Sequence, residues 1–391
     1  MLRSTLVVVL LILLSAFVVR GEGVSLSVDS RTIPGLTPKS STVTHIIRLS
    51  GPIEEGDSER LRAVLNRLKA GTPPLPGGPL ATIELSSAGG DVYEGLKIGY
   101  LLREYTVATV VRAKDLCLSA CALAFLGGTS RRTGPVAMPG RSIEIGGQVG
   151  FHNFSLNTSS DQVDPGRDPK EGMARGFAVA RGGASSLVRY AATMGVDMGF
   201  VARLLGRPTE QWEYIESAGT FIALQTCPVG LKMPTATPQT IAVNICNHST
   251  GWFDRADTFQ ARSYTAREAK RHMLEHVQEH IEAFSVKGPL VAQLKAVLAT
   301  RDEQLVDAVY NDLRSAGIAL PEWLGTFFVV SGYSSNVYEM QCQVSFSRDN
   351  PAKFEVTLHT PDGLIKPAQL PPANCPGLFT YDRDDILNPR R

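Results

Sequence analysis

Residues 83–91 read Ile83-Glu84-Leu85-Ser86-Ser87-Ala88-Gly89-Gly90-Asp91, and this stretch decides the fold of the first half of the chain. It predicts a strand that ends in a turn of small residues, followed by a run compatible with a helix. Because glycines have no side chain, the bare backbone N–H groups of such a turn can face a developing oxyanion.

Two later stretches supply the other parts of a serine hydrolase site, a nucleophile and a base, in that order along the chain. Cys117-Leu118-Ser119-Ala120-Cys121 opens an apolar run with a serine among small residues, and the N-terminus of a helix favours negative charge. Val149-Gly150-Phe151-His152 closes a short strand-like stretch with a histidine that can take the serine proton. Each motif is weak alone, so the order of donors, nucleophile and base carries the hypothesis.

Each of these residues also has a purely structural explanation. Ser119 would allow close helix packing, and His152 would be a hydrogen-bonded structural histidine. Gly89 and Gly90 would form a strand-to-helix turn that needs positive φ, and that role holds even if the catalytic one fails.

The elements around these motifs predict an α/β domain. Strands are expected at 44–49, 81–85 and 107–111, and helices begin at Asp57 or Ser58, at Asp91 in a capping box with Glu94, and at Ser119. Strands that alternate with helices imply a largely parallel sheet with crossover helices on its faces.

This order resembles the ClpP/crotonase superfamily, most closely the Clp-protease-like proteins of bacterial envelopes. The family pattern is strand, Ser-x-Gly-Gly turn, helix, strand, Ser-bearing helix, strand and His, and residues 43–226 follow it. The resemblance implies a ClpP/crotonase-like ββα-type core of sheet and helices. It also implies that Ser119 is the nucleophile and His152 the base, and that the N–H groups of Gly89 and Ala120 form the oxyanion hole. In multimeric relatives the element beyond the histidine packs against neighbouring subunits, so the resemblance also allows a homo-oligomer.

The acidic third member of a catalytic triad is not at the expected place before Tyr214. Glu210 or Asp197 could serve, or the site works as a Ser–His dyad. The acid fixes the histidine tautomer, and its loss costs orders of magnitude in rate.

The N-terminus predicts export. Residues 1–23 carry Arg3 and an apolar run over 6–19, which is typical of a signal peptide or an uncleaved signal anchor. We therefore expect a periplasmic or otherwise extracytoplasmic protein that contacts the membrane only if this segment is not cleaved. A net charge of +1 with 20% charged residues gives no reason to expect nucleic acid as a partner.

Six cysteines fit an oxidising compartment. Cys227 with Cys246 and Cys342 with Cys375 are natural local pairs, although the sequence does not fix the connectivity. Cys117 and Cys121 have i, i+4 spacing, and either form a bridge or fill a tight core.

Five segments organise the chain: the signal segment, a linker over 24–42, the ClpP/crotonase-like domain over 43–228, a linker and connecting segment over 229–264, and a C-terminal α+β domain over 265–391. In the first domain, 155–171 is polar and 177–194 predicts a helix. In the last domain, helices are expected at 265–284, 289–300 and 302–316, and strands at 326–330, 338–347 and 354–360. The role of this last domain does not follow from its sequence.

One helix carries a second motif. His276-Val277-Gln278-Glu279-His280 matches the inverted zinc-protease pattern His-x-x-Glu-His. A third ligand is needed, Glu355 lies far downstream, and the helix is polar on most sides. A solvated surface is therefore the favoured interpretation, and no metal site is expected. Asn153, Asn157 and Asn247 begin glycosylation sequons, which matter only in a eukaryotic source.

These observations predict an exported serine hydrolase, a peptidase that cleaves a peptide or protein substrate through an acyl-enzyme and needs no cofactor. The alternative is a non-catalytic ClpP-like binding or scaffold protein of the cell envelope. Crotonase-type acyl-CoA chemistry is a third hypothesis, and export disfavours it because coenzyme A is a cytoplasmic cofactor.

Overall fold

The computed structural model describes residues 23–390, apart from 34–41, 72–76, 134–135, 154–168, 252–258, 323–324, 335–338, 361–362, 366–369, 373–374 and the single residues 301, 321 and 348. The expected signal segment, except Gly23, and the sequon at Asn157 lie outside the described residues. Within these limits, none of the helices combines the length and the hydropathy needed to span a membrane.

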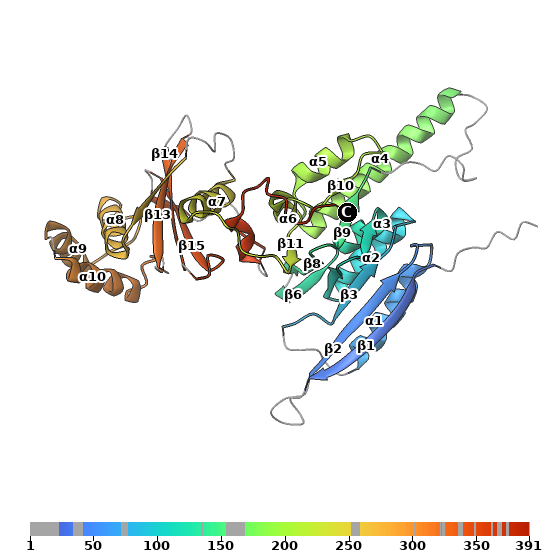
Figure 1. The fold of residues 1–391 in the computed structure, drawn as a ribbon, viewed down its shortest axis with the longest axis horizontal. Helices are drawn as coiled ribbons and strands as arrows, with labels where there is room; N and C mark the ends of the chain where they lie inside the picture. Colours follow the sequence, from blue (N-terminus) through green and yellow to red (C-terminus); the bar gives the residue numbers. More distant parts are fainter. Residues whose placement is uncertain are drawn as a thin grey trace, which may run out of the picture.

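A six-stranded mixed sheet forms the centre of the first domain (Figure 1), in the order β1-β2-β3-β4-β8-β11. Its strands are β1 (Ser25–Ile33), β2 (Thr42–Ser50), β3 (Ala81–Ser86), β4 (Val107–Val111), β8 (Arg141–Glu144) and β11 (Thr226–Val229). All neighbours from β2 to β11 pair in parallel, and only β1 runs antiparallel to β2. The α/β class and the predicted parallel sheet are therefore confirmed.

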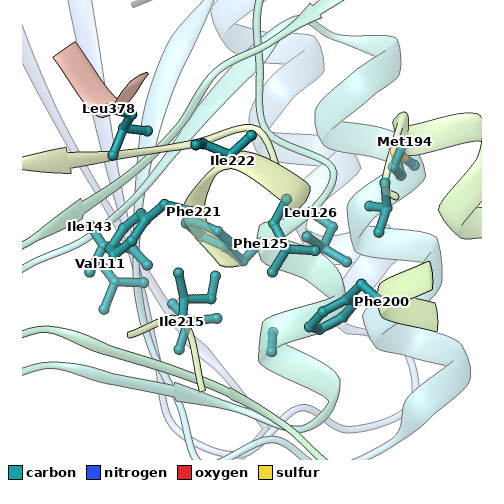
Figure 2. Packing of buried hydrophobic residues seen from close by; sticks show 14 of the residues in the cluster. Val111, Phe125, Leu126, Ile143, Met194, Phe200, Ile215, Phe221, Ile222 and Leu378 are labelled. Atoms are coloured by element: carbon teal, nitrogen blue, oxygen red, sulfur yellow. The ribbon is translucent and has the colours of Figure 1, made fainter. Parts of the chain in front are cut away.

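Helices α1 (Asp57–Ala70) and α2 (Val92–Glu104) connect the parallel strands. Burial alternates along β3, where Ala81, Ile83 and Leu85 are buried. The same core contains Phe125, Phe200 and Phe221, which come from three different helices (Figure 2). These three rings are at most 2% exposed, so the helices that carry them pack tightly against the rest of the domain.

The linker predicted over 24–42 is wrong over its first part, because Ser25–Ile33 is strand β1. This edge strand pairs with β2 along its whole length, from Ser25 opposite Ser50 to Ile33 opposite Thr42. Most of its described side chains are exposed, so the sequence shows no apolar alternation. The ladder of backbone hydrogen bonds forms the strand nevertheless.

The caps of α1 and α2 differ in part from those predicted. Gly56 caps α1 in a left-handed conformation, while the Asp57 carboxylate accepts from the N–H groups of Val24 and Glu54. Asp91 does cap α2, accepting from Glu94 N–H at 2.8 Å. The Glu94 carboxylate completes no capping box, however, because it accepts from the N–H of Ser58 at 2.9 Å and so ties the two helices together.

A second, three-stranded sheet has the order β10-β9-β5 and comprises β5 (Leu116–Leu118), β9 (Gln148–Phe151) and β10 (Glu213–Tyr214). Helix α3 (Ala120–Phe125) follows β5, and β6 (Thr129–Thr133) and β7 (Val136–Pro139) form a hairpin before β8. Three helices complete the domain: α4 (Pro169–Met194), α5 (Met198–Gly206) and α6 (Ala218–Ala223). Helix α4 begins before the predicted residue 177, with a proline in its first position.

The C-terminal half is an α+β unit, as predicted. Its sheet has the order β12-β13-β14-β15-β16, with β12 (Gln260–Tyr264), β13 (Thr326–Ser334), β14 (Glu339–Phe346), β15 (Phe354–Thr360) and β16 (Gly363–Ile365). Helix α7 (Pro238–Thr250) lies against this sheet, and α8 (Ala266–Glu279), α9 (Pro289–Ala299) and α10 (Glu303–Ser315) form a cluster farther from the first domain (Figure 1).

The connecting segment predicted over 229–264 is wrong where α7 and β12 form. The linker-like stretch before α7 has no regular structure over 231–237 and ends in the cap of this helix, where Thr237 accepts from Thr240 N–H and Pro238 occupies the first turn. The linker prediction is therefore wrong only from the start of α7 onward.

Three disulfides join Cys117 to Cys121, Cys227 to Cys375 and Cys246 to Cys342. The predicted local pairs Cys227–Cys246 and Cys342–Cys375 are wrong, because Cys246 on α7 faces Cys342 on β14 and Cys227 on β11 meets the C-terminal tail. Disulfides of this kind indicate an oxidising environment.

The C-terminal tail returns to the first domain. After the 3-10 helix η3 (Pro376–Thr380), the carbonyls of Asp385 and Arg383 accept from the N–H groups of Ala218 and Gly219. The Asn388 amide bonds both the N–H of Gly146 and the carbonyl of Gly147. Cys375 is therefore one of several attachments of this tail.

Candidate active site

Ser119 lies at the turn between β5 and α3. Its backbone has φ 56° and ψ −121°, a conformation that costs a residue with a side chain about 1–3 kcal/mol. Its N–H donates to the carbonyl of Gly150 at 2.9 Å, and the Cys117–Cys121 disulfide closes the turn from either side. A sharp strand-to-helix turn of this kind leaves a serine hydroxyl free of the strand and accessible for attack.

His152 directly follows β9, which pairs in parallel with β5. Because both strands end at the same edge, the two side chains meet there. Ser119 Oγ lies 2.7 Å from His152 Nε2. The structure therefore brings together the two residues that the sequence separates by 33 positions.

The carboxylate of Asp115 anchors β5 to the main sheet. It accepts two hydrogen bonds from Arg48, at 2.6 and 2.8 Å, and one from Ser86 Oγ at 3.0 Å. The hydrogen bond to Asp115 raises the pKa of the Arg48 guanidinium, although partial burial opposes the shift. This ion pair fixes the strand that carries the nucleophile, and sequence analysis missed it because its members lie 67 residues apart.

An aromatic side chain supports the imidazole. The ring of Trp212 lies against His152 with centroids 4.3 Å apart, and Trp212 in turn stacks on Tyr214 at 6.0 Å. The Asn153 amide donates to the carbonyls of Leu205 and Arg207, which holds the backbone next to the histidine. Sequence analysis missed Trp212, which directly precedes the strand that pairs with β9.

Neither acid considered for the triad contacts the histidine. Asp197 caps α5 by accepting from Phe200 N–H at 2.9 Å, and Glu210 accepts from the hydroxyl of Thr209 at an exposed position. The buried Glu213 pairs with Arg207 at 3.0 Å. Among the residues described, no carboxylate lies within ion-pair distance of His152, so this part of the chain supplies a Ser–His dyad.

One of the two expected backbone donors, the N–H of Gly89, already has a hydrogen-bond partner. The N–H of Gly89 donates to Ser87 Oγ at 3.0 Å, so it is already satisfied. The N–H groups of Gly90 and Ala120 make no hydrogen bond to any described residue. Gly89 still has a steric role, because a Cβ there would lie 2.8 Å from Ser119 Cβ and its φ is +101°.

A cavity of about 160 Å³ opens at the dyad. Most of its lining side chains are apolar, and it is bounded by Gly90, Val92, Ser119, Leu123, Phe151, His152, Leu187 and Leu204. Val92, Leu123 and Leu187 also line a neighbouring groove of about 470 Å³ between α2 and α4. The site therefore offers an apolar surface beside a polar dyad.

The remaining motifs have different outcomes. Asn247 is 3% exposed and accepts from the Tyr333 hydroxyl, so that sequon is buried. His276 is half-buried, and its Nε2 is a buried atom without a partner among the described residues, which contradicts a fully solvated surface. Potential ligand atoms of His276, Glu279 and His280 lie within 4.8 Å of one another.

No protein-family model matches the chain, and no curated protein sequence matches it significantly.

Proposed function

We propose that the protein is a serine hydrolase of the peptidase type, with Ser119 as nucleophile and His152 as base, on a fold of the ClpP/crotonase superfamily. The observation that carries the proposal is the 2.7 Å contact between Ser119 Oγ and His152 Nε2 at a turn with positive φ. The three disulfides support a place outside the cytoplasm, in the periplasm or beyond.

The reaction follows from the positions of these groups. When Nδ1 carries the ring proton, His152 Nε2 accepts the Ser119 proton as Oγ bonds to the substrate carbonyl carbon. The oxyanion that forms takes hydrogen bonds from the N–H groups of Gly90 and Ala120. His152 then gives its proton to the leaving amine, and water releases the acyl group from Ser119 by the same steps in reverse.

Trp212 and Asn153 orient the imidazole of His152, which is one of the two roles of the acid in a catalytic triad. They hold the imidazole plane toward Ser119, although a ring contact does not stabilise the imidazolium as a carboxylate would. We therefore expect a slower enzyme than one with a complete triad.

The lining of the cavity predicts the substrate. Val92, Leu123 and Leu187 surround the space next to Ser119, which has room for one aliphatic side chain. We propose peptide or protein substrates with a residue such as valine or leucine on the acyl side of the cleaved bond.

The test is covalent labelling with a fluorophosphonate, which reacts only with an activated serine. The wild-type protein should be labelled, and the Ser119→Ala and His152→Ala variants should not. Ser130→Ala is the matched control, because the Ser130 hydroxyl donates to the carbonyls of Met138 and Pro139 in the β6–β7 hairpin. Equal labelling of wild type and Ser119→Ala would exclude this nucleophile.

A second candidate function is a non-catalytic binding or scaffold protein that keeps the fold. The lack of a carboxylate at His152 among the described residues favours it. If it is correct, folded wild-type protein stays unlabelled, and Ser119→Ala leaves any cellular phenotype intact.

A further inference from the structure

Three histidines meet at the end of α8 that lies against the C-terminal sheet. His276 and His280 come from the last turn and the cap of α8, and His359 comes from β15. The ring of His276 lies 4.6 Å from that of His280 and 4.3 Å from that of His359, between centroids. This cluster belongs to the distal part of the molecule, away from β9 and the dyad (Figure 1).

Two of the three imidazoles have a buried nitrogen without a hydrogen-bond partner in the described part of the chain. His359 is 6% exposed, and its Nε2 has no hydrogen-bond partner among the described residues. The Nε2 of His276 is in the same situation. Buried polar atoms are nearly always paired in folded proteins, so two unpaired nitrogens in contacting rings require an explanation.

We propose that His276, His280 and His359 bind a divalent transition metal of the zinc type, with Glu279 as the fourth ligand. Potential ligand atoms of His276, Glu279 and His280 already lie within 4.8 Å of one another, and His359 joins them through its contact with His276. Tetrahedral zinc holds its ligand atoms about 3.3 Å apart, so the four side chains would have to move closer together on binding. Imidazole nitrogens favour zinc-like ions over Mg²⁺ or Ca²⁺.

Four protein ligands make a closed site, which is typical of a structural metal rather than a catalytic one. The helices α8–α10 have their own apolar core, whose members include Met273, Leu294 and Tyr310 and none from the sheet strands. On the sheet face next to His359, Gln343 and Thr357 are buried polar residues. The metal would therefore attach this helical cluster to the sheet where apolar packing is weak.

The test uses the full chain, stripped of metal with a chelator and titrated with Zn²⁺ by calorimetry. We expect one Zn²⁺ per chain and a rise in Tm on binding. His276→Ala and His359→Ala should weaken binding by roughly 100-fold or more, because even residues that only orient ligands are worth about 10–100-fold. His272→Ala is the control, since this exposed histidine of the same helix pairs with Glu275 and should bind Zn²⁺ normally.

Co²⁺ provides a second readout that does not depend on stability. The wild-type protein with Co²⁺ should show the intense visible absorption of a tetrahedral site, and Glu279→Gln should alter that spectrum while the chain stays folded by circular dichroism. Failure of the folded wild-type protein to bind Zn²⁺, or equal losses in His272→Ala and His359→Ala, would overturn the proposal. Neither outcome depends on whether Ser119 is active.

Discussion

At the scale of single residues, a side-chain partner decides which N–H groups of the glycine turn have no hydrogen bond to a described residue. The Ser87 hydroxyl takes the N–H of Gly89, so the second glycine of the turn becomes the candidate donor. Similarly, Asp197 caps helix α5 and Glu210 accepts from Thr209, so neither carboxylate contacts His152. The ring of Trp212 packs against the imidazole instead. Several short polar side chains near a turn can bond to its backbone groups, and the sequence does not show which of them forms the hydrogen bond.

Trp212 gives a prediction at this scale. In Trp212→Ala, His152 loses the ring against which it rests, and labelling of Ser119 by a fluorophosphonate should slow by about 10- to 100-fold, as expected for a displaced catalytic group. Trp212→Phe keeps an aromatic surface and should restore most of the rate. A rate unchanged in Trp212→Ala would show that the ring does not position the base.

At the scale of elements, strongly patterned segments were predicted well and weakly patterned ones were not. Strands β2, β3 and β4 and helices α1 and α2 lie where their apolar spacing indicates. Strand β1 and helix α7 were assigned to linkers. The first is a polar edge strand, and the start of the second has the composition of a loop.

Helix α7 gives a prediction of pH dependence. His248 on this helix is 1% exposed, with Nε2 at 2.9 Å from the carbonyl of Tyr381, and burial lowers its pKa to about 4 from 6.5. The unfolded chain therefore binds this proton more readily than the folded one. The stabilisation is fully present above pH 6.5 and is lost as the pH falls toward 4.

Because of His248, we expect the free energy of unfolding to fall by about 2 kcal/mol when the pH is lowered from 7 to 5. Urea denaturation at both pH values measures it, and His248→Gln, which keeps an amide donor but does not titrate, should reduce the pH dependence by about that amount. Burial also lowers the pKa of His359, so only the difference in pH dependence between wild type and His248→Gln is assigned to His248. The same loss in both proteins would contradict the assignment.

At the scale of the whole molecule, the C-terminal tail and the Cys227–Cys375 disulfide join the two halves. Cys227 and Cys375 are 148 residues apart, and the residues after Cys375 bond to α6 and to the turn at Gly146. The tail thus packs beside the domain that carries the dyad (Figure 1). Whether the chain forms a homo-oligomer stays a prediction.

Removal of this bridge is the test at this scale. Cys227→Ser combined with Cys375→Ser should lower the free energy of unfolding by about 2–5 kcal/mol, since a long loop regains freedom in the unfolded chain. Limited proteolysis should also cut the tail faster. Cys246→Ser with Cys342→Ser is the matched control, which should destabilise the protein without freeing the tail, because that bridge joins α7 to β14. Equal tail cleavage in wild type and the first variant would show that hydrogen bonds alone hold the tail.

The α/β class, a largely parallel sheet with the strands β2, β3 and β4, and the candidates Ser119 and His152 were all predictable from the sequence, because periodicity, caps and turns act over a few residues. The packing of the elements was needed to establish the cysteine pairing, the absence of an acid at His152 among the described residues, the hydrogen bond that occupies the N–H of Gly89, and the meeting of His359 with α8. These features join groups that lie far apart in the chain or that compete for one partner, so they depend on how the elements pack.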